Sequence, residues 1–328
     1  MWAPRVDEAS FSLEHCDPRR HIARAMKTVL AADLGGTKCR FAVLAEDLSV
    51  RNARTEPTPS DRSGFLSMMG EALQTVLAAE LPRDWETPSL LAVGTAGVIT
   101  RDARSIVYAP NLPLEGFGLA DQLEAVVGLP TTVVNDGRAS ALGEYLHGHA
   151  AGSDPLLVLF FGTGIGIGWT VDGKPYEGAT NAAGEVGHLL HLPDGRLCPC
   201  GRRGCYEAYC GGRPIVERAQ AEIGPAERGA WTVGDIVDRG DDPRAREILA
   251  DAEAAAGSLV ATLCTLLNPG AVVLGGGVLR GWPELSRSIE DRVRSWCQPV
   301  VTDDLRFVPS RGESDSILWG AARAAGAF

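Results

Sequence analysis

The sequence carries little positive charge, and it lacks both a long apolar run and an apolar leader. Lys and Arg number 31 against 42 Asp and Glu, which gives a net charge of −11. An acidic surface repels nucleic acid phosphates, and the short basic stretch at 19–27 is typical of a solvated tail. The missing apolar run argues against a membrane span, and the missing leader argues against secretion. We therefore expect a cytoplasmic protein with neither nucleic acid nor membrane as a partner.

Cysteine is scarce outside one short segment. Three of the eight cysteines fall within residues 198–205. The others stand singly, at Cys16, Cys39, Cys210, Cys264 and Cys297. A secreted disulfide scaffold would be smaller and denser in cysteine. The pattern indicates a reducing compartment and one metal site.

From Lys27 onward the apolar patterns alternate between strand and helix periods, which predicts an α/β fold. Strands are expected at 28–33, 39–45, 50–55, 90–93, 106–108, 131–134, 155–161, 165–171, 271–274 and 306–308. Helices are expected at 61–81, 119–127, 139–147, 206–223, 243–267, 284–295 and 316–325.

The strand–Gly-Thr–strand design of residues 28–45 recurs at 155–171, which predicts an internal repeat. The turn residues Thr37 and Thr163 lie 126 positions apart. A chain of 328 residues is long enough for two packed lobes. We predict an N-terminal extension at 1–25, a small lobe at 26–136 closed by a C-terminal helix at 314–328, and a larger lobe at 137–313.

Two glycine-rich hairpins are candidates for binding the phosphates of a nucleotide. Glycines at a hairpin tip let backbone N–H groups approach a phosphate, while a threonine adds a hydroxyl and a lysine adds charge. Neither hairpin opens a helix, so neither is a Walker motif or a dinucleotide fingerprint. A carboxylate at a strand end can reach the water shell of Mg²⁺. The candidates are Asp33, Gly35, Gly36, Thr37 and Lys38 in the first hairpin, and Gly162, Thr163 and Gly164 in the second.

A third glycine run, Gly275, Gly276 and Gly277, follows the expected strand at 271–274. A buried strand that ends in three glycines leaves flat backbone exposed, which would suit an adenosine. We therefore expect ATP with Mg²⁺ between lobes that can close over it.

Asn135 and Asp136 follow the strand at 131–134 and precede a helix. Ligands of α/β proteins bind at the carboxyl ends of strands, although Asn and Asp also cap helices well. The position between the two repeats favours catalysis. In that role Asp136 would accept the proton of an attacking sugar hydroxyl, as the general base of phosphoryl transfer.

Residues 198–207 read Cys-Pro-Cys-Gly-Arg-Arg-Gly-Cys-Tyr-Glu, which is the spacing of a tight zinc knuckle. Cys198, Cys200 and Cys205 supply three thiolates. Spacing offers His188 and His191 as the fourth ligand, with Cys210 as a further candidate, and does not separate the two histidines. A closed site of this kind is structural, and we expect zinc to fix a loop beside the substrate.

Together these stretches resemble the ROK family (repressors, open reading frames, sugar kinases) of the hexokinase and actin-like ATPase superfamily. The matching runs are Asp33–Lys38, Asn135-Asp136, Phe161–Gly168, Glu185–His188, Cys198–Glu207 and Leu274–Gly277. The resemblance implies two ribonuclease-H-like (actin-like ATPase) lobes, a homodimer, and ATP with Mg²⁺ and a hexose in the cleft. It selects His188 as the fourth zinc ligand. It assigns the sugar to Asn111, Asn135, Asp136, Glu185, His188 and Glu207.

The resemblance further implies a glucokinase-like enzyme of carbohydrate metabolism and glycolysis, which converts glucose to glucose 6-phosphate. The sequence departs from the family at Gly137-Arg138-Ala139-Ser140, where Ala-Asn-Ala-Ala is frequent, at Ala96-Gly97 and at Leu114. These departures bear on the choice of sugar, so N-acetylated hexosamines, mannose and fructose remain alternatives. A sugar-sensing regulator without catalysis is a more distant alternative, since only 32 residues precede Asp33.

Overall fold

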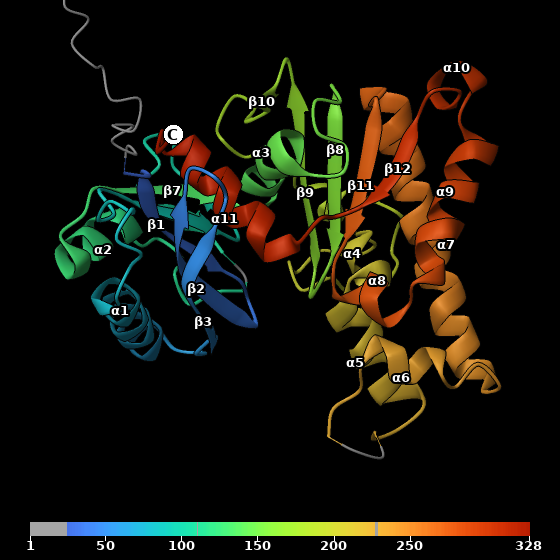
Figure 1. Cartoon of the computed structure of the whole chain (residues 1–328). Helices are drawn as coiled ribbons and strands as arrows, with labels where there is room; N and C mark the ends of the chain where they lie inside the picture. Colours follow the sequence, from blue (N-terminus) through green and yellow to red (C-terminus); the bar gives the residue numbers. More distant parts are fainter. Residues whose placement is uncertain (1–24, 110, 227–228) are drawn as a thin grey trace, which may run out of the picture.

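The computed structural model describes residues 25–109, 111–226 and 229–328, and they form two α/β lobes, each built on a five-stranded mixed sheet (Figure 1). The predicted extension at 1–25 lies outside these residues except for Ala25. The first lobe contains β1 (Thr28–Leu34), β2 (Lys38–Ala45), β3 (Val50–Pro57), α1 (Arg62–Ala78), β4 (Leu91–Thr95), β5 (Val98–Ile99), β6 (Ile106–Tyr108), α2 (Leu119–Val127) and β7 (Thr131–Asn135).

Helix α3 (Asp136–His147) follows β7 and leads into the second lobe. Its sheet contains β8 (Leu156–Phe161), β9 (Ile165–Val171), β10 (Lys174–Pro175), β11 (Ala271–Gly275) and β12 (Arg306–Pro309). The elements that follow in this lobe are η1 (Val186–His188), α4 (Glu207–Cys210), α5 (Gly212–Glu222), α6 (Val233–Val237), α7 (Pro243–Leu267), α8 (Gly277–Gly281), α9 (Glu284–Trp296) and α10 (Pro299–Thr302). The last helix, α11 (Glu313–Ala324), packs on β1 and β4 of the first lobe.

The two sheets have equivalent topologies. Their strand orders are β3-β2-β1-β4-β7 and β10-β9-β8-β11-β12. Each sheet contains an antiparallel hairpin, β1–β2 or β8–β9. The first strand of the hairpin also pairs in parallel with a later strand, β1 with β4 and β8 with β11. The repeat predicted from the two Gly-Thr turns is therefore present in the fold.

The inner strands β1, β4, β8 and β11 are buried on both faces, which explains why they read as nearly continuous apolar runs. In β1, Leu30 and Ala32 pack with α1 and α2, whereas Val29 and Ala31 pack with α11. In the second sheet, Leu157, Leu159 and Phe161 share a core with α4 to α9. The opposite face, with Leu156 and Val158, packs on α3.

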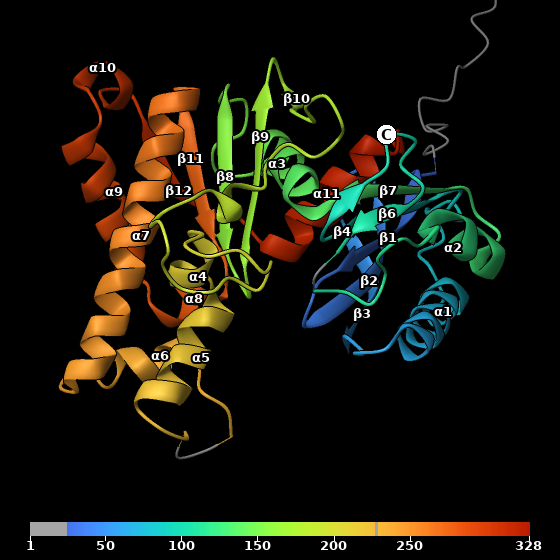
Figure 2. The same ribbon diagram turned by 180° about the vertical axis from the view of Figure 1, so that it is seen from behind.

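Helices α3 and α11 cross between the two sheets (Figures 1 and 2). Glycine allows the close crossing, because a Cβ at Gly320 would lie 1.6 Å from the Ala139 carbonyl oxygen. A Cβ at Gly143 would likewise lie 2.0 Å from the Ser316 carbonyl oxygen. The two lobes are thus joined by a tight helix pair, and α11 returns from the end of the chain to pack on β1 and β4.

Some elements differ from the sequence prediction. Helix α3 begins at Asp136 instead of Ala139, because the Asn135 side chain caps it by accepting from Arg138 N. The helix expected at 206–223 is broken at Gly211 into α4 and α5. Gly277, for which no helix was predicted, begins the short helix α8, and α6 was not predicted either.

We expected no segment long and apolar enough to cross a membrane. This was wrong for α7, which is long and apolar enough by length and composition alone. More than half of its apolar window, 56%, is buried inside the structure. Its buried side chains belong to the second-lobe core and include Leu259 and Val260. This is the placement of a core helix.

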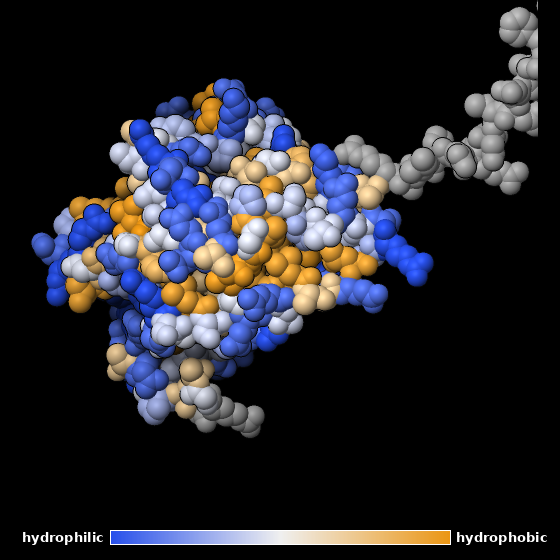
Figure 3. Space-filling model, turned by 90° about the vertical axis from the view of Figure 1, so that its left-hand side faces the viewer, coloured by the Kyte–Doolittle hydropathy of each residue, from blue (hydrophilic) through white to orange (hydrophobic). Residues whose placement is uncertain are grey.

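Apolar side chains gather in a band across the middle of the face shown in Figure 3, with hydrophilic side chains on either side. The net charge of −11 therefore does not make the surface uniformly polar.

Candidate active site

A cavity of about 670 Å³ opens between the two lobes, and both glycine-rich hairpins line it. Nearly all of the residues predicted to bind the nucleotide or the sugar contribute to its wall, although they come from segments far apart in the sequence. The predicted residues that line it are Asp33, Gly35, Gly36, Thr37, Lys38, Asn111, Asn135, Asp136, Gly162, Thr163, Gly164, Glu185, His188, Glu207 and Gly277. The fold thus assembles one site from the separate motifs.

The tips of the hairpins meet across the cavity. The hydroxyl oxygens of Thr37 and Thr163 lie 3.1 Å apart, within hydrogen-bonding distance. A side chain at Gly164 would collide with its surroundings, because a Cβ there would lie 2.3 Å from Glu207 Oε2. The glycine therefore keeps the tip of the second hairpin as bare backbone beside the cavity.

Asp136 lies where β7 ends and α3 begins, at the junction of the lobes. Capping of α3 falls to Asn135, whose side-chain nitrogen also donates to the Gly97 carbonyl at 3.0 Å. Asp136 lines the cavity instead, and its carboxylate accepts from Gly137 N at 2.8 Å. Burial raises the pKa of Asp136, and this hydrogen bond opposes the shift. A carboxylate with a raised pKa in a cleft is suited to act as a base.

The close packing of α3 on β9 fixes the position of Asp136. A Cβ at Gly137 would lie 2.0 Å from the Ile167 carbonyl oxygen, and a Cβ at Gly168 would lie 2.1 Å from the Gly137 carbonyl oxygen. Both positions therefore require glycine in the observed backbone. The first turn of α3 is held directly against the hairpin that carries Thr163.

Glu207 connects three parts of the site. Its Oε2 accepts from Ile165 N at 2.9 Å, so the carboxylate is bonded to the second hairpin. It also faces Gly187 of η1, where an added Cβ would lie 3.4 Å from the same oxygen. Glu207 follows Cys205 of the predicted zinc knuckle by two residues, so the knuckle, η1 and the hairpin converge on one carboxylate.

Glu185 lies in the same part of the cavity. Burial raises the pKa of Glu185, and the nearby His188 imidazole opposes that shift. Hexoses present several hydroxyls, and a carboxylate accepts hydrogen bonds from them. Besides Asp136, the lobe junction therefore offers two further carboxylates to a polar uncharged ligand. They belong to Glu185 and Glu207.

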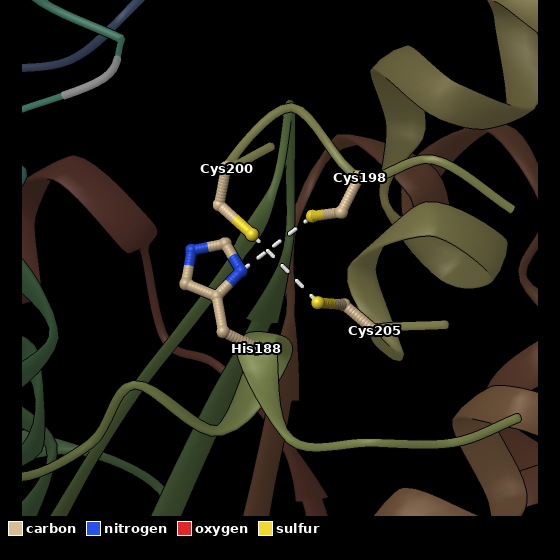
Figure 4. Close-up of side chains that lie close together, drawn as sticks. All are labelled: His188, Cys198, Cys200 and Cys205. Atoms are coloured by element: carbon tan, nitrogen blue, oxygen red, sulfur yellow. Dashed lines mark hydrogen bonds between the residues drawn. The ribbon is translucent and has the colours of Figure 1, made fainter. Parts of the chain in front are cut away.

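The four predicted zinc ligands point toward one another (Figure 4). The ligand atoms of His188, Cys198, Cys200 and Cys205 all lie within 4.8 Å of one another. His188 Nδ1 lies 3.6 Å from Cys198 Sγ, and Cys200 Sγ lies 3.7 Å from Cys205 Sγ. Three sulfurs and one imidazole nitrogen, converging on one point, are the donor set of a structural Zn²⁺ site. The residues present fit a zinc ion.

The rival ligands that spacing left open lie elsewhere. The His191 ring packs between Tyr206 and Tyr209, with ring centroids 4.6 and 5.0 Å away. Cys210 is fully buried, and its Sγ lies 3.4 Å from the Tyr206 carbonyl oxygen. His188 is therefore the histidine that the fold places with the three thiols.

The model of the ROK family matches residues 29–326, almost the whole of the described chain. The chain belongs to the ROK family. This confirms the resemblance drawn from the hairpins and the cysteine cluster, and the two actin-like lobes are the fold expected of it.

Curated ROK relatives with two different activities match at similar identity. A glucokinase of Streptomyces coelicolor is 30% identical over 268 residues, which cover 77% of this chain and 83% of the relative. An N-acetylmannosamine kinase of Citrobacter koseri is 35% identical over 254 residues, which cover 76% and 83%. Among solved structures, a ROK family glucokinase from Streptomyces griseus in complex with glucose and AMPPNP has a TM-score of 0.75 and 27% identity, with 90% and 98% of the chains covered.

Gly275 and Gly276 are not part of the cavity lining among the described residues, unlike Gly277. Gly275 ends the buried strand β11, and a Cβ there would lie 2.6 Å from the Phe160 ring. Gly276 has a φ of 110°, and a Cβ there would lie 2.2 Å from the Phe161 carbonyl oxygen. Both glycines pack beneath the site and carry the chain to Gly277, which does line it.

Sequence reasoning missed two cations and several apolar residues of this ROK cleft. Arg213 and Arg280 line the cavity, and Arg213 N donates to the Thr163 carbonyl at 2.9 Å. The missed apolar residues near them are Val216, Val233 and Val278. The sequence Gly211-Gly212-Arg213 could have indicated the position of Arg213. Like Gly35 and Gly36 before Lys38, its paired glycines leave backbone open beside a cation.

Proposed function

We propose that this ROK protein is an ATP-dependent hexose kinase, with Asp136 as the general base. The observation that carries the proposal is that Asp136 and both Gly-Thr hairpins line one cavity. The glycine backbone of the hairpins, with Thr37, Lys38 and Thr163, would bind the phosphates, and Asp33 would hold Mg²⁺ through its water shell. Mg²⁺ supplies neutralisation of the charge that develops on the phosphates.

The reaction is a transfer of the γ-phosphoryl group from ATP to a sugar hydroxyl. The hydroxyl gives its proton to the Asp136 carboxylate, its oxygen forms a bond to the γ-phosphorus, and the bond between that phosphorus and the bridging oxygen of ADP breaks. The protein acts mainly by positioning the two substrates and by excluding water between the lobes. We assign the sugar to Asn111, Asn135, Glu185, His188 and Glu207, and the adenosine to the glycine-rich segment at Gly277.

We propose glucose as the preferred hexose and the 6-hydroxyl as the acceptor, which the matches to glucokinases support. The match to an N-acetylmannosamine kinase at 35% identity favours a second candidate of the same class, an N-acetylated hexosamine. Mannose and fructose complete the set. The lobe boundaries near 136 and 313, a structural zinc ion, a homodimer and a cytoplasmic location stay predictions.

A coupled ATPase assay over glucose, N-acetylmannosamine, N-acetylglucosamine, mannose and fructose tests this function, with kcat/KM measured for each. Turnover of one of them, with loss of turnover in Asp136→Asn, supports the proposal. Turnover of none would contradict it.

A further inference from the structure

A buried arginine occupies the first turn of α3, two positions after the proposed base. Arg138 is 4% exposed. Burial lowers the pKa of Arg138, and the negative charges of Glu177, Asp136 and Glu185 oppose that shift. A buried guanidinium is costly unless its charge is compensated and its donors are bonded, so its place calls for an explanation.

The guanidinium reaches the loop 176–185, which joins β10 to η1. Arg138 Nη1 donates to the Asn181 carbonyl at 3.1 Å. The same loop carries Ala183, Gly184 and Glu185, all of which line the cavity. Arg138 itself is absent from that lining, so it acts on the cavity through the loop and not by direct contact.

Asn181 continues the connection into the first lobe. Its Nδ2 donates to the carbonyls of Ile99, at 2.9 Å, and Thr100, at 3.2 Å. Ile99 is fully buried in the first-lobe core, so this end is anchored. Asn181 has a φ of 61°, a left-handed conformation that asparagine tolerates and most other residues avoid.

We propose that Arg138 and Asn181 form a latch that holds the loop 176–185 against the first lobe and so positions the hexose site. The inference rests on the proposed hexose kinase function. Arg138 is a positioning residue in this scheme, because it touches neither substrate.

The test compares variants in the full-length protein. Arg138→Met removes the donor and the charge, whereas Arg138→Lys keeps both at shorter reach. Asn181→Gly keeps the left-handed backbone and the carbonyl that accepts from Arg138, but removes the donors to Ile99 and Thr100. The control is Arg244→Met, since Arg244 is exposed on α7 and pairs with Asp242.

Loss of one charge-assisted hydrogen bond predicts a rise of about tenfold in the KM for the hexose in Arg138→Met, with KM for ATP changed less than about twofold. Arg138→Lys should recover part of the loss. If the latch works as one unit, the double variant Arg138→Met with Asn181→Gly should show about the same rise as either single variant. Amide hydrogen exchange in 176–185 should become faster in Arg138→Met and in Asn181→Gly, and it should stay unchanged in Arg244→Met.

An unchanged hexose KM with unchanged exchange in the folded variants would overturn the latch, as would an equal rise in both KM values. If Arg138→Met fails to fold, the hexose KM and the amide exchange of 176–185 in Asn181→Gly test the latch instead. If the wild-type protein phosphorylates none of the hexoses, the proposed function is wrong, and the exchange rates of 176–185 still decide whether the latch exists.

Discussion

The hydroxyl oxygens of Thr37 and Thr163 lie 3.1 Å apart, although the residues are separated by 126 positions in the chain. Each threonine is at the tip of an antiparallel hairpin in its own lobe. The contact places two glycine-flanked tips on the same cavity. An anion held there would receive backbone N–H groups from both lobes, so its binding would be coupled to the relative position of the lobes.

Thr163→Val tests this arrangement, because valine keeps the shape and removes the hydroxyl. Loss of one hydrogen-bonding group should raise the KM for ATP roughly three- to tenfold and leave the KM for the hexose nearly unchanged. Steady-state kinetics at saturating hexose measure the effect. Thr75→Val is a matched control, since the Thr75 hydroxyl donates within the exposed surface of α1. A hexose-only effect would contradict the assignment.

Asp136→Asn should reduce kcat by roughly 10²–10⁴-fold, the usual contribution of a general base. ATP binding, measured by calorimetry, should be retained because the hairpins are unchanged. Burial raises the pKa of Asp136, so in the wild-type protein kcat/KM should increase with pH as that carboxyl ionises. The residual activity of Asp136→Asn should lack this rise. Wild-type turnover in the variant would exclude Asp136 from the mechanism.

The same shift has a consequence for stability. Because the pKa of Asp136 is raised in the folded state, its contribution to stability is fully present below the unfolded value of about 4. That contribution is lost as the pH rises through the folded value. At neutral pH, Asp136→Asn should therefore melt at the same temperature as the wild-type protein or higher, and its melting temperature should depend less on pH. If Asp136→Asn melts at a clearly lower temperature than the wild-type protein at neutral pH, the claim that burial of the Asp136 charge destabilises the fold is wrong.

Removal of Cys200, a proposed zinc ligand, should unfold the knuckle and lower the melting temperature by on the order of 5–10 °C. The purified wild-type protein should contain about one zinc per chain by elemental analysis, and Cys200→Ser should contain little. A chelator should lower the wild-type melting temperature to that of the variant and leave the variant unchanged. Cys297→Ser is the control, because Cys297 is a buried cysteine far along the chain from the cluster. Full zinc content in Cys200→Ser would rule out the site.

Local patterns were sufficient to predict most of the strands, though not the short β5 and β10, and they predicted both hairpins and the cysteine cluster, because each depends on neighbours in the sequence. The fourth metal ligand depended on tertiary structure. His188 and His191 are equally plausible by spacing, and the fold separates them by packing His191 on Tyr206 and Tyr209. Only the resemblance to the ROK family selected His188 beforehand.

The broken helix at Gly211 shows the same limit. The sequence from 206 to 223 has a helical pattern, yet Gly212 N and Arg213 N donate to the carbonyls of Gly162 and Thr163. These bonds to the second hairpin take the place of helical ones. Sequence periodicity contains no information about a hairpin 50 residues earlier, so the break at Gly211 could not be predicted from it.

Glu207 tests whether the knuckle supports nucleotide binding by the second hairpin, because its Oε2 accepts from Ile165 N at 2.9 Å. Glu207→Ala removes that bond together with any sugar contact, so KM for both ATP and the hexose should rise. Glu207→Gln keeps an oxygen that can accept from Ile165 N, so it should raise mainly the hexose KM, about tenfold. The two substitutions therefore separate the two roles of one carboxylate. Equal effects of Ala and Gln on the KM for ATP would show that the bond to Ile165 does not support the hairpin, and the coupling between knuckle and nucleotide would have to be abandoned.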